Sequence, residues 1–329
     1  MCEANRNLGS PLRIRGFDVS RDACETARAA GHHREQADVR SLDPRDFAGY
    51  TGLIVTPPCP PWSASGKRTA LGDDYQRALD AITAYGMWNR SDYSDLDDEE
   101  LAEYEAYAGD VSAGDEDWAR LPDEVDDPRT ALVIETARWA LLMPDIEWMI
   151  CEQVPAVEHL WEDLAAELYA AGWESVDVHV LSALDYGAGA RRTRTFLMAK
   201  RYAPLTGSPL SSVERPTSMA SVLGWPSGEQ VRTRNNRKAG GGNLFSADGP
   251  SWCLTGSTRT WTRESDGERL SAAQAGVLQG FPADYPWQGS RTSQFLQAAD
   301  VVSPLVGTAV LGSVLGLDWR SALRHTDAA

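Results

Sequence analysis

The sequence lacks the features that mark several classes of protein. No apolar run reaches the ~18 residues of a membrane span, and residues 1–6 lack the hydrophobic core of a signal peptide. The cysteines show no C-x-x-C spacing, so they indicate neither a zinc site nor a disulfide framework. We therefore expect a reduced, cytoplasmic protein with no metal and no membrane partner.

Basic residues are also scarce. The 329 residues include 31 Lys and Arg against 48 Asp and Glu, a net charge of −17. This charge argues against a nucleic-acid partner, because phosphate contacts need cations. The distribution of charge reverses that argument. Between Trp88 and Pro128 there are sixteen acidic residues and two arginines, a balance of −14, whereas Arg191 to Lys238 contain ten Lys or Arg and two Glu, a balance of +8.

The acidic block is interpreted as a solvated, partly disordered insertion over about 88–128, with a mobile electrostatic gate as the alternative. The basic segment is predicted to face the phosphates of a nucleic acid. A chain of this length can form one large α/β domain and a smaller one.

Strands and helices alternate over residues 1–202, which predicts an α/β fold with a doubly wound, mostly parallel sheet. Residues 203–267 are rich in Gly, Pro, Ser, Thr and Arg and predict a small lobe. Residues 268–329 are predicted to return to the core domain. The predicted strands cover 12–18, 52–55, 148–151, 176–181 and 195–199, and the predicted helices cover 21–30, 131–143, 160–171, 271–281 and 305–316.

Four polar or nucleophilic residues follow predicted strands, where open α/β sheets bind ligands: Asp18, Asp38, Cys59 and Glu152. Prolines surround Cys59 and make its loop stiff. A stiff loop suits a nucleophile that must meet a reacting atom closely. A buried structural cysteine is the alternative.

Two segments resemble motifs of the DNA cytosine-C5 methyltransferases. T-P-P-C-P-P-W-S-A-S-G-K-R at 56–68 resembles the nucleophile loop, with Pro60 for the usual Gln and Trp62 for Phe. C-E-Q-V at 151–154 resembles the family's E-N-V, with Gln153 for Asn.

Two later segments continue the resemblance in the family's order. L-S-A-L-D-Y-G at 181–187 and R-T-R at 192–194 resemble N-A-x-D-Y-G-x-x-Q-x-R-x-R, with Ala190 for Gln. R-L-S at 269–271 and L-Q-G-F-P-A-D-Y at 278–285 resemble R-x-L-T and Q-G-F-P-x-x-Y. Together the four matches cover almost the whole chain.

The resemblance implies roles for the catalytic residues. Cys59 would add to carbon 6 of cytosine and so make carbon 5 nucleophilic. Glu152 would hold N3 and the exocyclic amine. Arg194, with Arg192 beside it, would bind O2 and stabilise the charge that develops. A helix-capping glutamate and surface arginines are the structural alternatives.

The resemblance also implies S-adenosyl-L-methionine as the cofactor. Asp18 fits the ribose hydroxyls and Asp38 the adenine amino group, whereas Asp300 stands where the family has Asn and would repel the cofactor carboxylate. The predicted cofactor site comprises Asp18, Val19, Asp38, Val39, Pro58 and Asp300.

The implied substrate is double-stranded DNA, from which the target nucleotide must be flipped out. The basic segment resembles a short target-recognition region, with a solvated loop as the alternative. We expect a monomer, and the resemblance admits a cognate restriction endonuclease as a partner. The predicted DNA contacts are Ser63, Lys67, Arg68, Arg232, Arg234, Arg237 and Lys238.

One family element is absent. The glycine-rich cofactor loop should precede Asp18, and residues 2–9 resemble the latter half of the helix that follows it. We therefore expect Met1 to be a truncated or misassigned start. Two alternative functions stay open: a catalytically impaired DNA-binding relative, and a tRNA cytosine-C5 methyltransferase.

Overall fold

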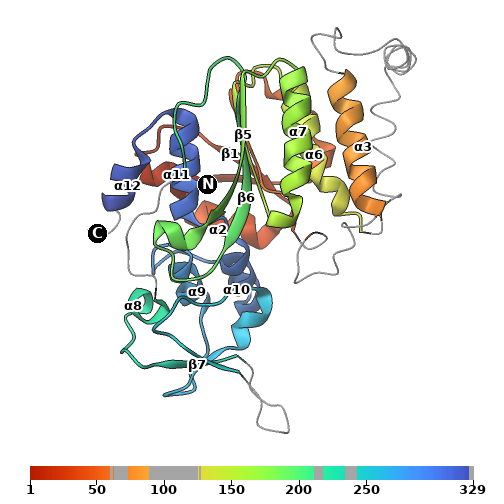
Figure 1. The fold of residues 1–329 in the computed structure, drawn as a ribbon. Coiled ribbons are helices and arrows are strands. Elements are labelled where there is room, and N and C mark those ends of the chain that lie inside the picture. Colours follow the sequence, from red (N-terminus) through yellow and green to blue (C-terminus); the bar gives the residue numbers. More distant parts are fainter. Residues whose placement is uncertain are drawn as a thin grey trace. The chain divides into compact units, whose positions relative to one another are not determined.

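The structure is a computed structural model that describes residues 1–59, 62, 73–88, 125, 127–210, 218–233 and 243–325. The chain has an α/β fold (Figure 1), and the predicted fold class is confirmed. It divides into two compact units. One consists of Met1–Val39, Leu181–Thr193 and Gly207–Ala329, and the other consists of Arg40–Val180 and Arg194–Thr206.

The second unit is built on a four-stranded sheet in the order β3-β4-β6-β5. Strand β4 runs parallel to β3 and antiparallel to β6, and all six of its residues are buried. Burial on both faces explains why its sequence, W-M-I-C-E-Q, is mostly apolar rather than alternating. The strands are β3 (Gly52–Val55), β4 (Trp148–Gln153), β5 (Ser175–Ser182) and β6 (Thr193–Lys200).

Three helices belong to this unit: α3 (Asp73–Trp88), α6 (Glu135–Leu142) and α7 (Glu158–Ala170). Helix α3 packs against α7 and α6, and α6 also packs against β3 (Figure 1). Helix α7 buries Leu160, Leu164 and Leu168, whose spacing of four residues gives it one apolar face.

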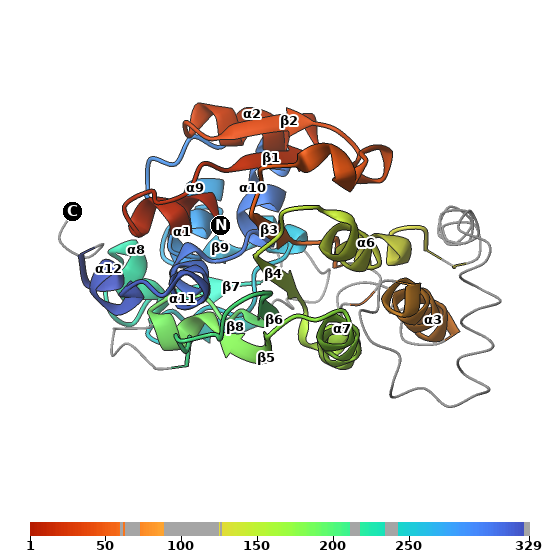
Figure 2. The ribbon, with the colours of Figure 1, turned by 90° about the horizontal axis from the view of Figure 1, so that it is seen from above.

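The first unit contains a parallel strand pair, β1 (Arg15–Asp18) and β2 (His33–Gln36), joined by α2 (Arg21–Ala29) (Figure 2). Ser20 begins α2 by accepting a hydrogen bond from the backbone N of Ala23. Helix α1 (Cys2–Asn7) packs against α11 (Pro304–Leu315), and α12 (Trp319–His325) follows. Helix α11 is apolar and buried on all sides, and it ends at Gly316 with φ 70°.

A three-stranded sheet, in the order β8-β7-β9, also lies in the first unit. Its strands are β7 (Gln230–Arg232), β8 (Leu244–Ser246) and β9 (Thr262–Arg263). One hydrophobic cluster joins this sheet to α8 (Met219–Leu223), α9 (Ala272–Leu278) and α10 (Arg291–Asp300). The described residues on both sides of position 267 therefore share a core, and the predicted division there stays a prediction.

Short 3-10 helices complete the described chain: Val39–Ser41, Pro44–Phe47, Thr130–Val133, Pro155–Val157, Ala183–Tyr186 and Gly256–Thr260. Among the described residues, no single helix is both long and apolar enough to cross a membrane, and only the bent pair α10 and α11 passes this test when the two are taken together.

Helix α10 was not predicted from the sequence. Its sequence, R-T-S-Q-F-L-Q-A-A-D, buries only Phe295, Ala298 and Ala299, so the apolar period is weak. Its beginning is better marked, because the Ser290 side chain accepts a hydrogen bond from the backbone N of Ser293.

The close contact of Gly52 with Trp148 gives a test of the fold. The two residues pair across β3 and β4, and a β-carbon at position 52 would overlap the indole ring of Trp148. Alanine normally stabilises a strand relative to glycine. Here we expect Gly52→Ala to lower the free energy of unfolding by about 1–3 kcal/mol, the usual cost of overpacking.

Urea unfolding measures this change. The matched control is Gly249→Ala, because a β-carbon at position 249 would meet no atom within 4 Å. Equal stabilities for the two variants would contradict the packing described for β3 and β4.

Candidate active site

The loop that carries Cys59 follows β3 and is held on its N-terminal side by Gln153. The Gln153 side-chain amide donates hydrogen bonds to the carbonyl oxygens of Pro57, at 3.0 Å, and Pro58, at 3.2 Å. The strand register explains why Gln153 contacts Pro57. Val55 pairs with Cys151 in the parallel strands, so the residues two positions further along, Pro57 and Gln153, lie side by side. Gln153 is buried, so these bonds are shielded from water.

The C-terminal side of the loop is held by Trp62. Its backbone N donates to the carbonyl oxygen of Cys59 at 3.0 Å. The indole is fully buried and makes an edge-to-face contact with Tyr75 of α3, with ring centroids 6.3 Å apart. Cys59 itself is half-buried. Two buried side chains thus fix the loop on both sides of the predicted nucleophile.

Glu152 and Arg194 form an ion pair at the ends of β4 and β6. The Nε atom of Arg194 lies 2.9 Å from Oε1 of Glu152, and the side chains are 14% and 10% exposed. The antiparallel register explains the contact, because Gln153 pairs with Thr195 and thus brings Arg194 beside the end of β4. In such a shielded place each charge depends on the other, because a buried charge without its partner is costly.

No sequence motif singles out Arg129, which follows the acidic block. Its guanidinium is ion-paired with Asp127 at 2.6 Å, and this hydrogen bond is the main cause of its raised pKa, to which Cys59 adds a smaller contribution.

Arg192 and Arg194 have different partners. Arg192 is buried in the first unit, and its two terminal nitrogens donate to the carbonyl oxygens of Ala299 and Asp300, each at 2.8 Å. These carbonyls end α10, where a cation is favourable. The geometry favours a structural role for Arg192 at this helix end.

The predicted cofactor acids follow the parallel strands β1 and β2. Asp18 pairs with Gln36, and the backbone N of Ala37 donates to the carbonyl oxygen of Asp18 at 3.1 Å, so Asp18 and Asp38 both leave the same edge of the strand pair. One carboxylate oxygen of Asp18 accepts from the backbone N of Ser20 at 2.8 Å. Val19, between β1 and α2, is 64% exposed.

The carboxylates of Asp18 and Asp38 can accept hydrogen bonds from hydroxyl and amino groups, and the exposed Val19 side chain can cover a ring face, so the three residues are compatible with an adenosine. Asp38 and Val39 are half-buried. Pro58 precedes Cys59 in the second unit, and Asp300 is exposed at the end of α10 in the first.

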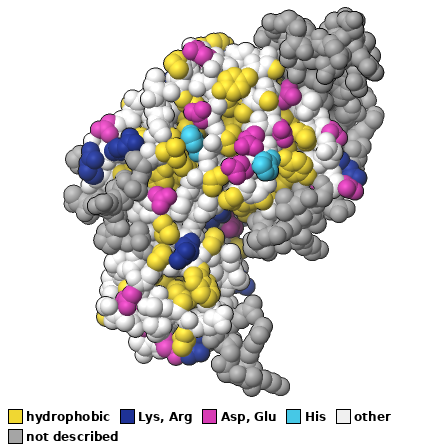
Figure 3. Space-filling model, viewed as in Figure 1, with side chains coloured by type: hydrophobic (Ala, Val, Ile, Leu, Met, Phe, Trp, Pro, Cys, Tyr) yellow, Lys and Arg dark blue, Asp and Glu magenta, His cyan; other side chains and the backbone are white. Residues whose placement is uncertain are grey.

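Most of the predicted DNA contacts lie outside the described residues: Ser63, Lys67, Arg68, Arg234, Arg237 and Lys238. Arg232 is described, and its guanidinium makes two hydrogen bonds with Glu264, at 2.8 and 2.6 Å. Lys and Arg side chains are sparse on the described part of the face shown in Figure 3. The acidic block also lies almost entirely outside the described residues.

No protein-family model matches the chain, and no curated protein matches its sequence. Solved structures match its fold. The Entamoeba histolytica methyltransferase EhMeth is 12% identical with a TM-score of 0.56, and the match covers 95% of this chain and 94% of that one. A mutant of Spodoptera frugiperda DNMT2 is 13% identical with a TM-score of 0.57, covering 95% and 96%.

A DNA modification methyltransferase encoded within an E. coli prophage is 16% identical with a TM-score of 0.52, and the match covers 96% of this chain and 94% of that one. At these identities the similarity shows that the chain shares the fold of these methyltransferases.

The hydrogen bonds of Gln153 yield a test of the loop. Gln153→Glu keeps the shape of the side chain but replaces the amide donor with an acceptor that faces two carbonyls. We expect a loss of about 1–3 kcal/mol, the cost of leaving buried polar groups unpaired. A loop weakened by about 1 kcal/mol opens roughly fivefold more often, so iodoacetamide should modify Cys59 faster.

Peptide mass spectrometry separates modification of Cys59 from that of the other cysteines. Gln230→Glu is the matched control, because the Gln230 side chain lies on β7 of the first unit and makes no hydrogen bond among the described residues. If the rate at Cys59 were the same in both variants, Gln153 would not hold the loop.

Proposed function

We propose that this chain is a DNA cytosine-C5 methyltransferase that acts through a covalent adduct at Cys59. The observation that carries the proposal is the linkage of the Cys59 loop to the end of β4. Gln153 binds the loop, and its neighbour Glu152 pairs with Arg194. The fold shared with the methyltransferases named above supports the same class of reaction.

Cys59 supplies the nucleophile. Carbon 5 of cytosine is a poor nucleophile, and addition of a thiolate to carbon 6 places electron density on carbon 5. After methyl transfer, loss of the proton on carbon 5 expels the thiolate and restores the ring. The hydrogen bonds made by Gln153 and by the backbone N of Trp62 hold the backbone around Cys59, which would keep the sulfur positioned for this addition.

Glu152 and Arg194 bind the polar edge of the cytosine. This edge presents O2, an acceptor, beside N3 and the exocyclic amino group. A cation and an anion held 2.9 Å apart offer the complementary pattern, with Arg194 toward O2 and Glu152 toward N3 and the amine. The charge of Arg194 stabilises the negative charge that the addition places on the ring. We assign Arg192 no part in this step.

S-adenosyl-L-methionine supplies an electrophilic methyl group when bound. Asp18 is proposed to hold the ribose hydroxyls and Asp38 the adenine amino group, with Val19 against the ring. Val39 and Pro58 complete the proposed set. Asp300 would place a negative charge near the cofactor carboxylate and weaken its binding.

The nucleophile can be tested without any methyl donor. When Cys59 adds to carbon 6, carbon 5 can take a proton from water, and elimination then releases tritium from DNA that contains [5-³H]cytosine. We expect Cys59→Ser to abolish this release. Glu152→Gln should slow it roughly 10²–10⁴-fold, the usual contribution of a positioned acid or base.

Cys253→Ser is the matched control, because Cys253 is an exposed cysteine outside the proposed site. Release from tRNA but not from DNA would favour the tRNA alternative. DNA binding without release would favour a catalytically impaired relative. Normal release by Cys59→Ser would refute the covalent mechanism.

A further inference from the structure

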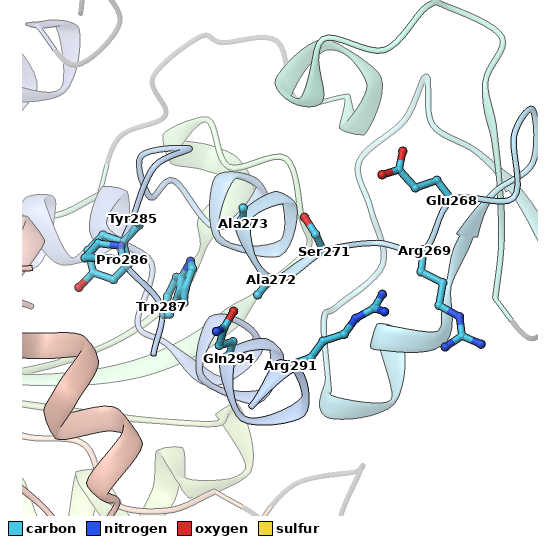
Figure 4. A pocket seen from close by; sticks show the side chains of 10 residues that line it. All are labelled: Glu268, Arg269, Ser271, Ala272, Ala273, Tyr285, Pro286, Trp287, Arg291 and Gln294. Carbon is cyan, nitrogen blue, oxygen red and sulfur yellow. The ribbon is translucent and has the colours of Figure 1, made fainter. Parts of the chain in front are cut away.

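A pocket of about 710 Å³ lies in the first unit, and none of its lining residues belongs to the site proposed above. It is formed by the segment between β9 and α9, the start of α10, and residues 285–287. Figure 4 shows the Arg269 and Arg291 side chains extending toward one end of the pocket, with Tyr285 and Pro286 at the other. Glu268 lies at the same end as Arg269, so the charged end of the pocket carries two positive charges and one negative charge, and the other end is aromatic.

The two arginines have no charge partner within the described part of the chain. Neither side chain makes an ion pair or a hydrogen bond there. The neighbouring arginines differ, since Arg232 binds Glu264 and Arg263 binds Asp266. Glu268 also lines the pocket, but its carboxylate lies 3.9 Å from Arg263. The two arginines and Glu268 thus leave the pocket with a net charge of about +1, and neither arginine is ion-paired within the described residues.

Arg269 and Arg291 line the same pocket in a chain with a net charge of −17, where carboxylates are plentiful. Several other exposed arginines, such as Arg21 and Arg45, are ion-paired. The planar guanidinium matches the geometry of phosphate and can bind it with two parallel hydrogen bonds. A pocket of this volume is larger than one phosphate needs, and its aromatic end can contact a sugar or a base.

We propose that this pocket binds the backbone phosphates of the nucleic-acid substrate, with Arg269 and Arg291 as the phosphate ligands. The proposal rests on the proposed function, because that function supplies the nucleic acid. It assigns phosphate binding to residues outside the basic segment of 191–238. Ser271 and Gln294, which also line the pocket, are hydrogen-bonding groups beside the two arginines.

The test is the salt dependence of DNA affinity, measured by fluorescence anisotropy with a 30-base-pair duplex. Arg269→Gln/Arg291→Gln should reduce the slope of log affinity against log salt by about 0.9 if the arginines share one phosphate, and by about 1.8 if they hold two. Affinity at 0.1 M salt should fall roughly tenfold. Arg269→Lys/Arg291→Lys should keep most of the slope, because the charges remain.

The matched control is Arg21→Gln/Arg45→Gln, which removes the same charge from two arginines that are already ion-paired. We expect it to leave the slope unchanged. Both double variants alter exposed side chains, so their melting temperatures should match that of the parent protein. An equal fall in slope for the control would show a general charge effect and overturn the assignment.

Two further outcomes separate this inference from the proposed function. If the parent protein releases tritium but the Arg269 and Arg291 variant keeps the parent's salt slope, the phosphate site is refuted and the proposed function stands. If the variant has a reduced slope but the parent protein releases no tritium, the phosphate site stands and the proposed function is refuted. Deoxycytidine monophosphate provides a third arm. Tight binding of this free nucleotide, lost in the variant while duplex binding is unaffected, would make the pocket a small-molecule site and overturn the proposal.

Discussion

The two hydrogen bonds from Gln153 to the nucleophile loop are the constraint on which the proposed site depends. Parallel pairing of β3 with β4 brings the loop level with Gln153, and the prolines at 57 and 58 leave carbonyl oxygens as the loop's main polar groups there. One amide group supplies a donor for each carbonyl. A buried side chain thereby couples the position of Cys59 to the strand that carries Glu152.

Charge in this protein is organised by pairing. Glu152 and Arg194 form an ion pair that is shielded from water. The Arg192 guanidinium donates hydrogen bonds to the carbonyl oxygens at the end of α10. Several exposed arginines have carboxylate partners, as Arg21 and Arg45 do. Arg269 and Arg291 have none among the described residues and line one pocket, which is why that pocket is the proposed place for an external anion.

The sequence predicted the regular elements better than the contacts. Runs of apolar residues predicted β3 and β4. The positions at the ends of the predicted strands indicated Asp18, Cys59 and Glu152 as candidate site residues. The role of Gln153 could not be predicted, because its partner Pro57 lies 96 residues away and only the β3–β4 register brings them together. Arg192 and Arg194 are two positions apart, yet their different partners are set by tertiary packing. Helix α10 was missed because its apolar period is weak.

The central claim is that Cys59 bonds covalently to the target cytosine. The most direct measurement is peptide mass spectrometry of the protein trapped on duplex DNA containing 5-fluorocytosine, in the presence of S-adenosyl-L-methionine. Carbon 5 of this base carries fluorine in place of the hydrogen that is normally lost as a proton, so the methylated adduct cannot eliminate the thiolate. The account predicts one modified peptide, linked through the sulfur of Cys59. An adduct at another cysteine, such as the exposed Cys253, would contradict it.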